Sequence, residues 1–471
     1  MSGLVWNVLD KLISQFGFLI VTLYLAKLIG PESFGLIGML MIFMLLAESV
    51  VSSGFSQALV QRSEALTSDD TSTIFYVNVA YGLAIYALLY FSAPLIAQFY
   101  GEPELVEIAR LLFLVIIINS LAVVVRAQLL IKVDFKSQAI AAAIATVISA
   151  GAGLYLAKSG YDYWAFVWML LLRALVQTIC LWLFTRWIPK LVFSLDSFKS
   201  LFFFGSNLII AGFISTLVNN IYIALVGKYY NAASVGYFTQ ATNLTNFLAQ
   251  FITSTMQGVS YPVLTSIKME RERLIAAYRK IIQLTMLVSL PALIGFSAVA
   301  QEFVHLFLGE QWLSAVPIIQ ILCFARAITP ISAVSMSILN VIGRSDLFLK
   351  VDLVKLPVTV GTLLVAVNFG IEAVAVAVVI NVLISFLINS YFPGKYFDFG
   401  ALAQLNSTKN YFIAAAIMFI GVGLLGFSEE WYWLCMKVGV GSVVYFSMLI
   451  LLKDPIFLGM AFRFVKRARL Q

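Results

Sequence analysis

Residues 35–60 of the chain, GLIGMLMIFMLLAESVVSSGFSQALV, form an apolar stretch in which Glu48 is the only charged side chain. About 20 apolar residues in a helix are enough to span the ~30 Å hydrocarbon core of a bilayer. The stretch also lacks the regular apolar and polar alternation of a membrane β-strand. It therefore predicts a membrane-spanning α-helix.

The same pattern continues along the chain. Only 11% of the 471 residues are charged, 62% are hydrophobic and the mean hydropathy is +0.98, whereas soluble domains carry about 25% charged residues. This composition predicts an all-α polytopic membrane protein and excludes soluble enzymes, nucleic-acid-binding proteins and secreted scaffolds. Polar breaks with Gly or Pro divide the chain into fourteen predicted spans: 4–29, 34–60, 74–99, 107–131, 138–157, 163–187, 199–228, 233–262, 279–308, 312–341, 347–369, 371–393, 409–427 and 431–453.

The distribution of basic residues predicts the orientation of these spans. Of the 30 Lys and Arg residues, twenty fall in loops on the side of both termini, and only Lys27, Arg110, Lys158 and Lys228 fall in loops on the other side. Because cytoplasmic loops are enriched in Lys and Arg, both termini are predicted to be cytoplasmic. The pI of about 9.1 is thus a topology signal, and we expect no nucleic-acid partner.

Three short matches indicate an internal repeat. Residues 27–35 parallel 228–236, residues 100–105 parallel 308–313, and residues 132–135 parallel 344–347, at offsets of 201, 208 and 212. Matched loops lie on the same predicted side, which is typical of parallel repeats related by an axis along the membrane normal.

The repeat predicts two parallel six-helix lobes around a central cavity. The lobes are an N-lobe of helices 1–6 at 1–197 and a C-lobe of helices 7–12 at 198–395, and 396–471 adds helices 13 and 14 with a basic cytoplasmic tail. Two lobes around a cavity are typical of transporters that work by alternating access.

A few basic side chains lie inside predicted spans, where each charge costs about 2.5–3.5 kcal/mol on insertion scales and so faces a cavity or a partner. Arg173 and Arg326 lie near the centre of their spans, one in each lobe. We interpret both as anion-binding cavity residues; the alternative is an ion pair of either one with Glu48. Arg126 and Lys355 lie nearer the cytoplasmic face and either join the cavity or snorkel, and Lys437 is expected to snorkel at the outer face.

Amide and hydroxyl side chains recur along the predicted span 233–262. They fall every three or four residues, which places them on one helix face: Thr239, Gln240, Asn243, Asn246, Gln250, Thr253, Ser254 and Gln257. This stripe favours a hydrated pathway for sugar hydroxyls, which need donors and acceptors more than charge. The alternative is hydrogen bonding between helices. Asn219 and Asn220 are candidates for the same surface.

Two acids are candidates for ion coupling. Glu48 lies in the middle of its span, where desolvation favours the neutral carboxyl group, and Asp10 lies beside Lys11 near the start of the first span. The three cysteines are far apart and show no metal-type spacing, and we expect no metal, no cofactor and no catalytic residue.

Three motifs resemble a known family. Gly30-Pro31-Glu32-Ser33-Phe34-Gly35, Leu308-Gly309-Glu310-Gln311-Trp312 and Ile338-Leu339-Asn340-Val341-Ile342-Gly343-Arg344-Ser345-Asp346 look like the polysaccharide-transport family. These are the O-antigen, colanic-acid and teichuronic-acid type flippases of the multidrug/oligosaccharidyl-lipid/polysaccharide exporter superfamily. The resemblance covers roughly the whole chain.

This resemblance implies a function in the bacterial cytoplasmic (inner) membrane. It implies export of an undecaprenyl-pyrophosphate-linked oligosaccharide, with Arg173, Arg326, Lys355 and Arg126 near the pyrophosphate and the polar stripe near the sugars. Membrane lipids and polysaccharide polymerase machinery are the further partners that it implies.

The buried charges and the loop lengths disfavour two other functions. A cation- or proton-coupled multidrug exporter of the same superfamily would need acids in the cavity, but the charges inside the spans are mainly basic. A membrane polysaccharide polymerase or ligase would need a large external loop, but the predicted external loops are short.

Overall fold

A computed structural model describes residues 16–61, 67–344 and 346–468, and in these residues all regular secondary structure is helical. Ten of the described helices are long and apolar enough to cross a membrane. The all-α polytopic prediction is therefore confirmed. The predicted count of fourteen spans stays a prediction, although α8, α9 and the shorter apolar helix α16 lie at three further predicted spans.

The chain divides into two compact units, at residues 1–236 and 237–471. The boundary lies in the first turns of α9, whereas the repeat predicts lobes that meet at 197 and 198. The first unit holds α2 (Phe18–Gln61), α3 (Ser68–Tyr100), α4 (Leu105–Leu112), α5 (Leu114–Ile131), α6 (Phe135–Lys158), α7 (Asp162–Thr185), α8 (Leu195–Tyr229) and the start of α9 (Ala232–Ser266).

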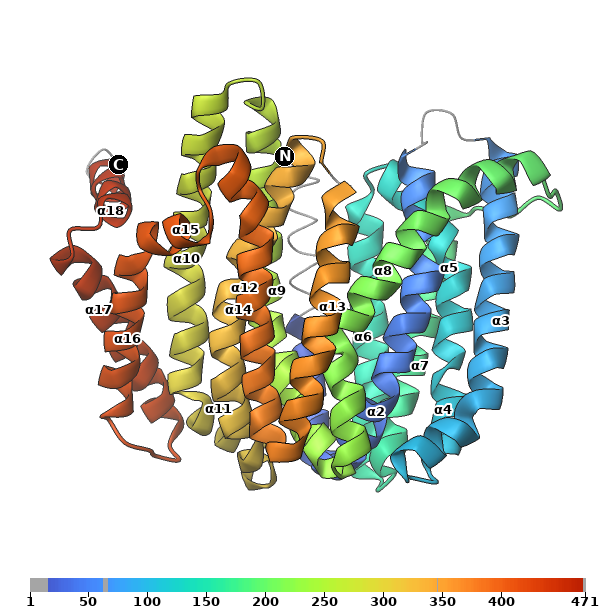
Figure 1. The fold of residues 1–471 in the computed structure, drawn as a ribbon. Helices are drawn as coiled ribbons and strands as arrows, with labels where there is room; N and C mark the ends of the chain where they lie inside the picture. The colour runs from blue at the N-terminus through green and yellow to red at the C-terminus, as the bar shows by residue number, and fades with distance from the viewer. Residues whose placement is uncertain (1–15, 62–66, 345, 469–471) are drawn as a thin grey trace. The chain divides into compact units, whose positions relative to one another are not determined.

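The second unit continues α9 and carries the added C-terminal helices. Its further elements are α10 (Arg271–Ala298), α11 (Ala300–Phe307), η3 (Glu310–Ala315), α12 (Val316–Val341), α13 (Asp346–Ala366), η4 (Val367–Phe369), α14 (Ile371–Phe397), α15 (Ala401–Ser407), α16 (Lys409–Gly423), α17 (Trp431–Leu451) and α18 (Pro455–Ala468). Figure 1 shows the long helices within each unit running side by side, with α16 and α17 next to each other.

The backbone turns follow the internal repeat. Gly101 and Gly309 both have positive φ at the offset of 208, and Gly160 and Gly370 do so at an offset of 210. Helices α7 and α14 each end in a left-handed residue, Arg186 with φ 50° and Asp398 with φ 53°, at an offset of 212. Since L-residues other than glycine rarely adopt this conformation, its recurrence is strong support for a common plan.

A break inside α2 separates the first two predicted spans. Gly30 has φ 77° and ψ 171°, which no α-helix accommodates, and Pro31 follows it. An added Cβ on Gly35 would lie 1.8 Å from the Ala232 carbonyl oxygen, and one on Gly236 would lie 2.0 Å from the Pro31 carbonyl oxygen. Pro31 and Gly35 match Ala232 and Gly236 at the offset of 201. The two repeat copies thus make the same backbone contact on each other, within residues assigned to the first unit.

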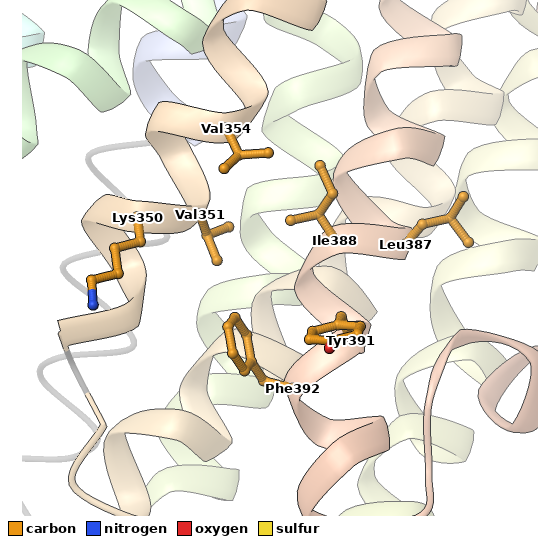
Figure 2. Close-up of a pocket in the computed structure, with 7 residues that line it drawn as sticks. All are labelled: Lys350, Val351, Val354, Leu387, Ile388, Tyr391 and Phe392. Carbon is orange, nitrogen blue, oxygen red and sulfur yellow. The ribbon is translucent and has the colours of Figure 1, made fainter.

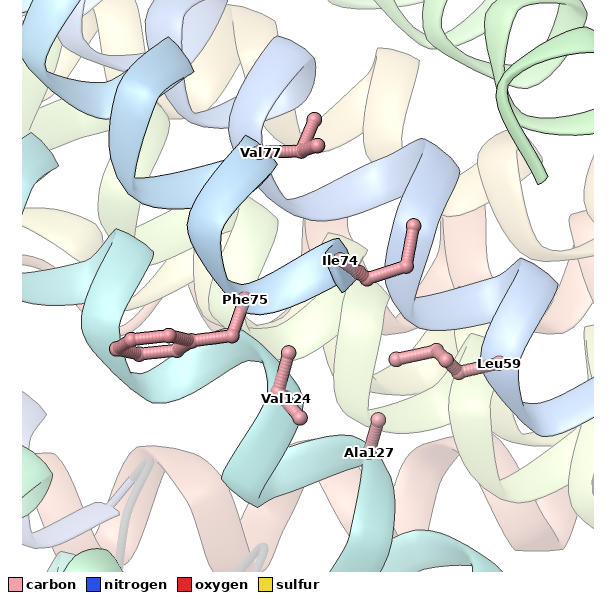
Figure 3. Close-up of a cluster of buried hydrophobic side chains, with 6 residues drawn as sticks. All are labelled: Leu59, Ile74, Phe75, Val77, Val124 and Ala127. Atoms are coloured by element: carbon pink, nitrogen blue, oxygen red, sulfur yellow. The ribbon is translucent and has the colours of Figure 1, made fainter. Parts of the chain in front are cut away.

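A buried apolar cluster holds α2, α3 and α5 together in the first unit. It comprises Leu59, Ile74, Phe75, Val77, Val124 and Ala127, and Figure 3 shows these side chains converging from the three helices. Val124 and Ala127 flank Arg126 on α5, so the cluster also fixes the helix that carries this arginine.

Candidate functional site

Glu48 of α2 faces a polar position on α5. The Asn119 side-chain nitrogen donates a hydrogen bond of 2.7 Å to a Glu48 carboxylate oxygen. Both side chains line a cavity of about 100 Å³ together with Arg126, Val51, Ile116 and Val123. Residues 116, 119, 123 and 126 recur every three or four positions, so one face of α5 supplies them. Glu48 therefore lies in a small cavity that is lined by both polar and apolar side chains.

Two arginines lie beside this cavity. Arg126 is near enough to Glu48 for their opposite charges to attract each other, and near enough to Arg173 for the two like charges to repel. The Arg173 guanidinium of α7 lies 3.8 Å from the centroid of the Phe18 ring on α2, a cation–π contact that stabilises a partly desolvated cation. The structure thus brings Glu48, Arg126 and Arg173 together from three helices, which we name the Glu48 cluster.

The second unit holds the other two predicted phosphate-binding residues. Arg326 of α12 is partly buried, and its Nε makes no hydrogen bond within the described residues of that unit. Lys355 of α13 is 8% exposed, and its Nζ lies 3.1 Å from an Asp352 carboxylate oxygen one turn earlier. Arg326 therefore keeps a cationic group available for an anion, whereas the Lys355 charge is already compensated.

The predicted polar stripe divides into three parts along α9. Thr239 and Gln240 are buried at its beginning, and the Gln240 carbonyl oxygen has no hydrogen-bond donor among the described residues. Asn243 and Gln250 are exposed in the middle of the helix, with Asn246 partly buried between them. At the other end, the Gln257 side-chain nitrogen donates to Ser337 Oγ of α12 at 3.0 Å.

The stripe therefore combines the two interpretations that the sequence leaves open. Gln257 bonds to a neighbouring helix, and Asn243 and Gln250 present accessible amides. Asn219 and Asn220 of α8 belong to the first unit, where each donates to a carbonyl oxygen of its own helix, at 2.7 and 2.8 Å. Asp10 lies outside the described residues.

One buried charge pair contradicts an expectation. Lys437 of α17 is 4% exposed, and its Nζ lies 2.5 Å from a carboxylate oxygen of Glu302 on α11, which is itself 1% exposed. The expectation that Lys437 snorkels at the outer face is wrong, because a buried carboxylate neutralises it inside the protein. Sequence reasoning missed Glu302 because this residue lies near a predicted span end, where a carboxylate is compatible with solvent.

The chain is similar in sequence to proteins of polysaccharide biosynthesis. The model of a family described as "Polysaccharide biosynthesis protein" matches residues 24–317. The chain is 28% identical over 416 residues to the teichuronic acid biosynthesis protein TuaB of Bacillus subtilis (strain 168), covering 86% of this chain and 85% of that protein. It is 24% identical over 367 residues to the succinoglycan biosynthesis transport protein ExoT of Rhizobium meliloti (strain 1021), covering 78% and 73%.

A similar fold occurs among solved structures. The lipid II flippase MurJ in an inward closed conformation superposes with a TM-score of 0.80 at 16% identity, covering 96% of this chain and 100% of that one. At this identity the similarity shows a shared fold.

Proposed function

Because the chain belongs to the polysaccharide biosynthesis protein family, we propose that it is a flippase that translocates undecaprenyl-pyrophosphate-linked oligosaccharide units across the bacterial cytoplasmic membrane. It is a multi-pass membrane protein related to polysaccharide transporters, and the glycan it carries would serve surface polysaccharide assembly, as O-antigen or exopolysaccharide. The observation that carries this proposal is the Glu48 cluster, a cationic site between apolar helices.

The cluster suits a pyrophosphate because two arginines lie near each other beside one carboxylate, which acts on Arg126. Arg126 and Arg173 repel each other, and Glu48 offsets part of this repulsion through Arg126. An incoming pyrophosphate carries more negative charge than one carboxylate and accepts bidentate hydrogen bonds from guanidinium groups. It would therefore replace Glu48 as the partner of Arg126 and also contact Arg173, while the Asn119 amide would still bind Glu48.

The other residues of the proposed substrate-binding set belong mainly to the second unit. Arg326 is the cation there that we assign to the pyrophosphate, with Lys355 in a lesser role because Asp352 already pairs with it. Asn243, Asn246 and Gln250 offer amides to sugar hydroxyls, and Gln240, Gln257, Asn219 and Asn220 complete the proposed sugar-binding set.

We propose the topology on which this transport depends. Fourteen spans, with both termini cytoplasmic, would form lobes at 1–197 and 198–395 and an added pair of helices in 396–471. The lobes would enclose a central cavity and alternate its access between the two membrane faces, while the lipid tail stays in the bilayer. Such repeats commonly rock against each other around a fixed site.

Glu48 is also the proposed coupling group, with Asp10 as a second candidate. When a pyrophosphate binds Arg126, the Glu48 carboxylate loses the attraction of that cation, and the neutral form of Glu48 becomes more favourable. Substrate binding and proton uptake would then be linked.

Export of lipid-linked glycan in a strain that lacks the native gene tests the proposal. Arg126→Ala and Arg173→Ala should each lower surface polysaccharide about tenfold and cause lipid-linked intermediates to accumulate, since a charged hydrogen bond contributes about 1.5–3 kcal/mol. Arg110→Ala is the matched control, because Arg110 stacks on Tyr90 at 4.5 Å, outside the Glu48 cluster.

Glycan export tests the substrate site, and the pH dependence of export tests the coupling role of Glu48. Full export by both arginine variants at normal membrane levels would remove the Glu48 cluster from the substrate site. Glu48→Gln should flatten the pH dependence of transport, and an unchanged pH profile would exclude Glu48 as the coupling group. Extrusion of cationic drugs without any change in lipid-linked glycan would favour a multidrug exporter.

A further inference from the structure

Helices α13 and α14 leave an apolar groove between them. One hollow, of about 400 Å³, is lined by Lys350, Val351 and Val354 from α13 and by Leu387, Tyr391 and Phe392 from α14, among others. Figure 2 shows the apolar side chains of the two helices facing each other, with Lys350 on the α13 side. Farther along the same helices lies a second hollow of about 550 Å³, between Gly361–Phe369 and Ala373–Ile380. We name the two hollows together the α13–α14 groove.

The groove has the dimensions of a lipid chain. Lys350 and Gly361 are eleven residues apart on α13, which at 1.5 Å per residue is about 16 Å. This length is close to half of the ~30 Å hydrocarbon core, so an acyl chain of one leaflet would extend from the first hollow to the start of the second. Val354 and Leu387 are 58% and 52% exposed, which leaves room for such a chain.

The groove ends in a group of cations. Lys350 is exposed and forms no ion pair or hydrogen bond within the described part of the chain. Asp352, the nearest acid in sequence, pairs instead with Lys355 at 3.1 Å. The first hollow is thus lined mainly by apolar side chains and carries at one end Lys350, a cation with no ion-pair partner in the described residues.

Two arginines converge on the same end through Tyr396. The Arg344 guanidinium donates to the Tyr396 hydroxyl at 2.9 Å, and the Arg271 guanidinium donates to the Tyr396 carbonyl oxygen at 3.0 Å. Tyr396 packs against the apolar cluster that contains Val351, so these contacts fix both arginines near the wall of the groove. Acids also lie near these arginines in the sequence, at Glu270, Glu272, Asp346 and Asp398, so Lys350 is the cation that distinguishes this end of the groove.

We propose that the α13–α14 groove binds an anionic glycerophospholipid of the bilayer, with one acyl chain in the groove and the headgroup phosphate beside Lys350. The apolar walls would hold the chain, and Lys350 with Arg344 would distinguish an anionic from a zwitterionic headgroup. A basic residue near the membrane surface contributes about 1 kcal/mol of attraction to anionic lipid. The groove lies on the described surface of the second unit, and its lining shares no residue with the proposed transport site.

Native mass spectrometry of the full-length protein, after titration with phosphatidylglycerol or phosphatidylcholine, tests this proposal. Wild-type protein should bind phosphatidylglycerol in preference. Lys350→Ala should weaken that binding about fivefold, the factor that corresponds to ~1 kcal/mol, and Lys350→Arg should retain it. Lys280→Ala is the matched control, since Lys280 is an exposed lysine on α10, away from the groove residues.

A second variant tests the groove itself. Val354→Trp should fill the first hollow and reduce phosphatidylglycerol binding, whereas Val443→Trp, on the exposed face of α17, should leave it unchanged. Equal binding by Lys350→Ala, Val354→Trp and their controls would overturn the proposal. Loss of both lipids alike with Val354→Trp, without headgroup preference in the wild type, would overturn the anionic selectivity.

The occupant can also be distinguished from the transported lipid. Recovery of a polyprenyl lipid from the wild-type protein, absent from Val354→Trp, would assign the groove to the substrate tail and overturn the phospholipid proposal. The export assay with Arg126→Ala and Arg173→Ala reports on the transport site alone, so failure of one proposal leaves the other intact.

Discussion

The helix pairs α6–α7 and α13–α14 occupy equivalent places in the two repeat copies, yet they pack differently. Helices α6 and α7 pack closely, and Ala141, Ala142 and Ala145 of α6 are buried. At the offset of 212, Ala141 and Ala142 match Leu353 and Val354 of α13, which are 47% and 58% exposed. Because small residues let helix backbones approach in a membrane, replacing alanines with larger side chains favours an open groove.

This difference indicates that the two copies are more alike in the backbone of their turns than in the packing of their helix pairs. Gly101 and Gly309, Gly160 and Gly370, and Arg186 and Asp398 keep left-handed or positive-φ backbones in both copies. The side chains between these turns have diverged, and so one copy has a closed helix pair and the other a groove. A further difference is the Glu302–Lys437 pair: Glu302 matches Pro94 at the offset of 208, and Lys437 belongs to the added helices.

The largest effect is expected from breaking the charge pair that joins Glu302 of the second copy to Lys437 of the added helices. Lys437→Met leaves Glu302 buried without its cation and should destabilise the protein by about 3–5 kcal/mol. The double variant Glu302→Leu with Lys437→Met should recover most of this loss, because no buried charge remains. Unfolding in mixed detergent and SDS micelles measures both.

Lys409→Met serves as the control for this pair, because Lys409 is an exposed lysine at the start of α16 in the same added helices. Equal stability of the single variant, the double variant and the control would show that the ion pair does not hold α17 to α11.

A somewhat smaller effect is expected where the two copies make the same contact. Gly35→Ala and Gly236→Ala should each lower stability by about 3 kcal/mol, at the upper end for overpacking, because the new methyl groups would lie within 2.0 Å of carbonyl oxygens. Gly258→Ala on α9 meets nothing within 4 Å and should be neutral or stabilising. Very different losses for Gly35→Ala and Gly236→Ala would refute the equivalence of the two contacts.

The smallest effect on stability is expected from substitutions that compare the α6–α7 pair with the α13–α14 pair. A Cβ on Gly153 of α6 would lie 3.0 Å from the Met169 Cβ of α7, whereas one on Gly361 of α13 would meet nothing within 4 Å. Gly153→Leu should therefore cost about 1–3 kcal/mol, and Gly361→Leu should cost little. Thermal unfolding of the two variants in the same detergent makes the comparison, and equal midpoints would contradict it.

Part of the candidate site could be predicted from single residues. Glu48, Arg126 and Arg173 are identifiable because a charge inside an apolar span needs a partner or water. Which of them meet could not be predicted, since their helices are far apart in sequence. Asn119 was missed because one asparagine in an apolar helix carries no charge, although its hydrogen bond orients Glu48.

The polar stripe shows the same limit on one helix. Its spacing correctly assigns eight side chains to α9, but neighbouring helices decide their environments. Gln257 meets Ser337 on α12, whereas Gln250 stays exposed. Periodicity shows which residues share one face of a helix, but it does not show what that face contacts.

By itself, the sequence determined the membrane class and the all-helical fold and predicted most helix ends and an internal repeat, because these depend on local composition and on backbone turns. The tertiary structure decided the partners. It paired Lys437 with Glu302, brought Glu48, Arg126 and Arg173 together, packed α6 closely on α7 and left hollows between α13 and α14. The physical reason is that hydropathy and turn preference act within one segment, whereas charge pairing and close packing depend on side chains that distant segments bring together.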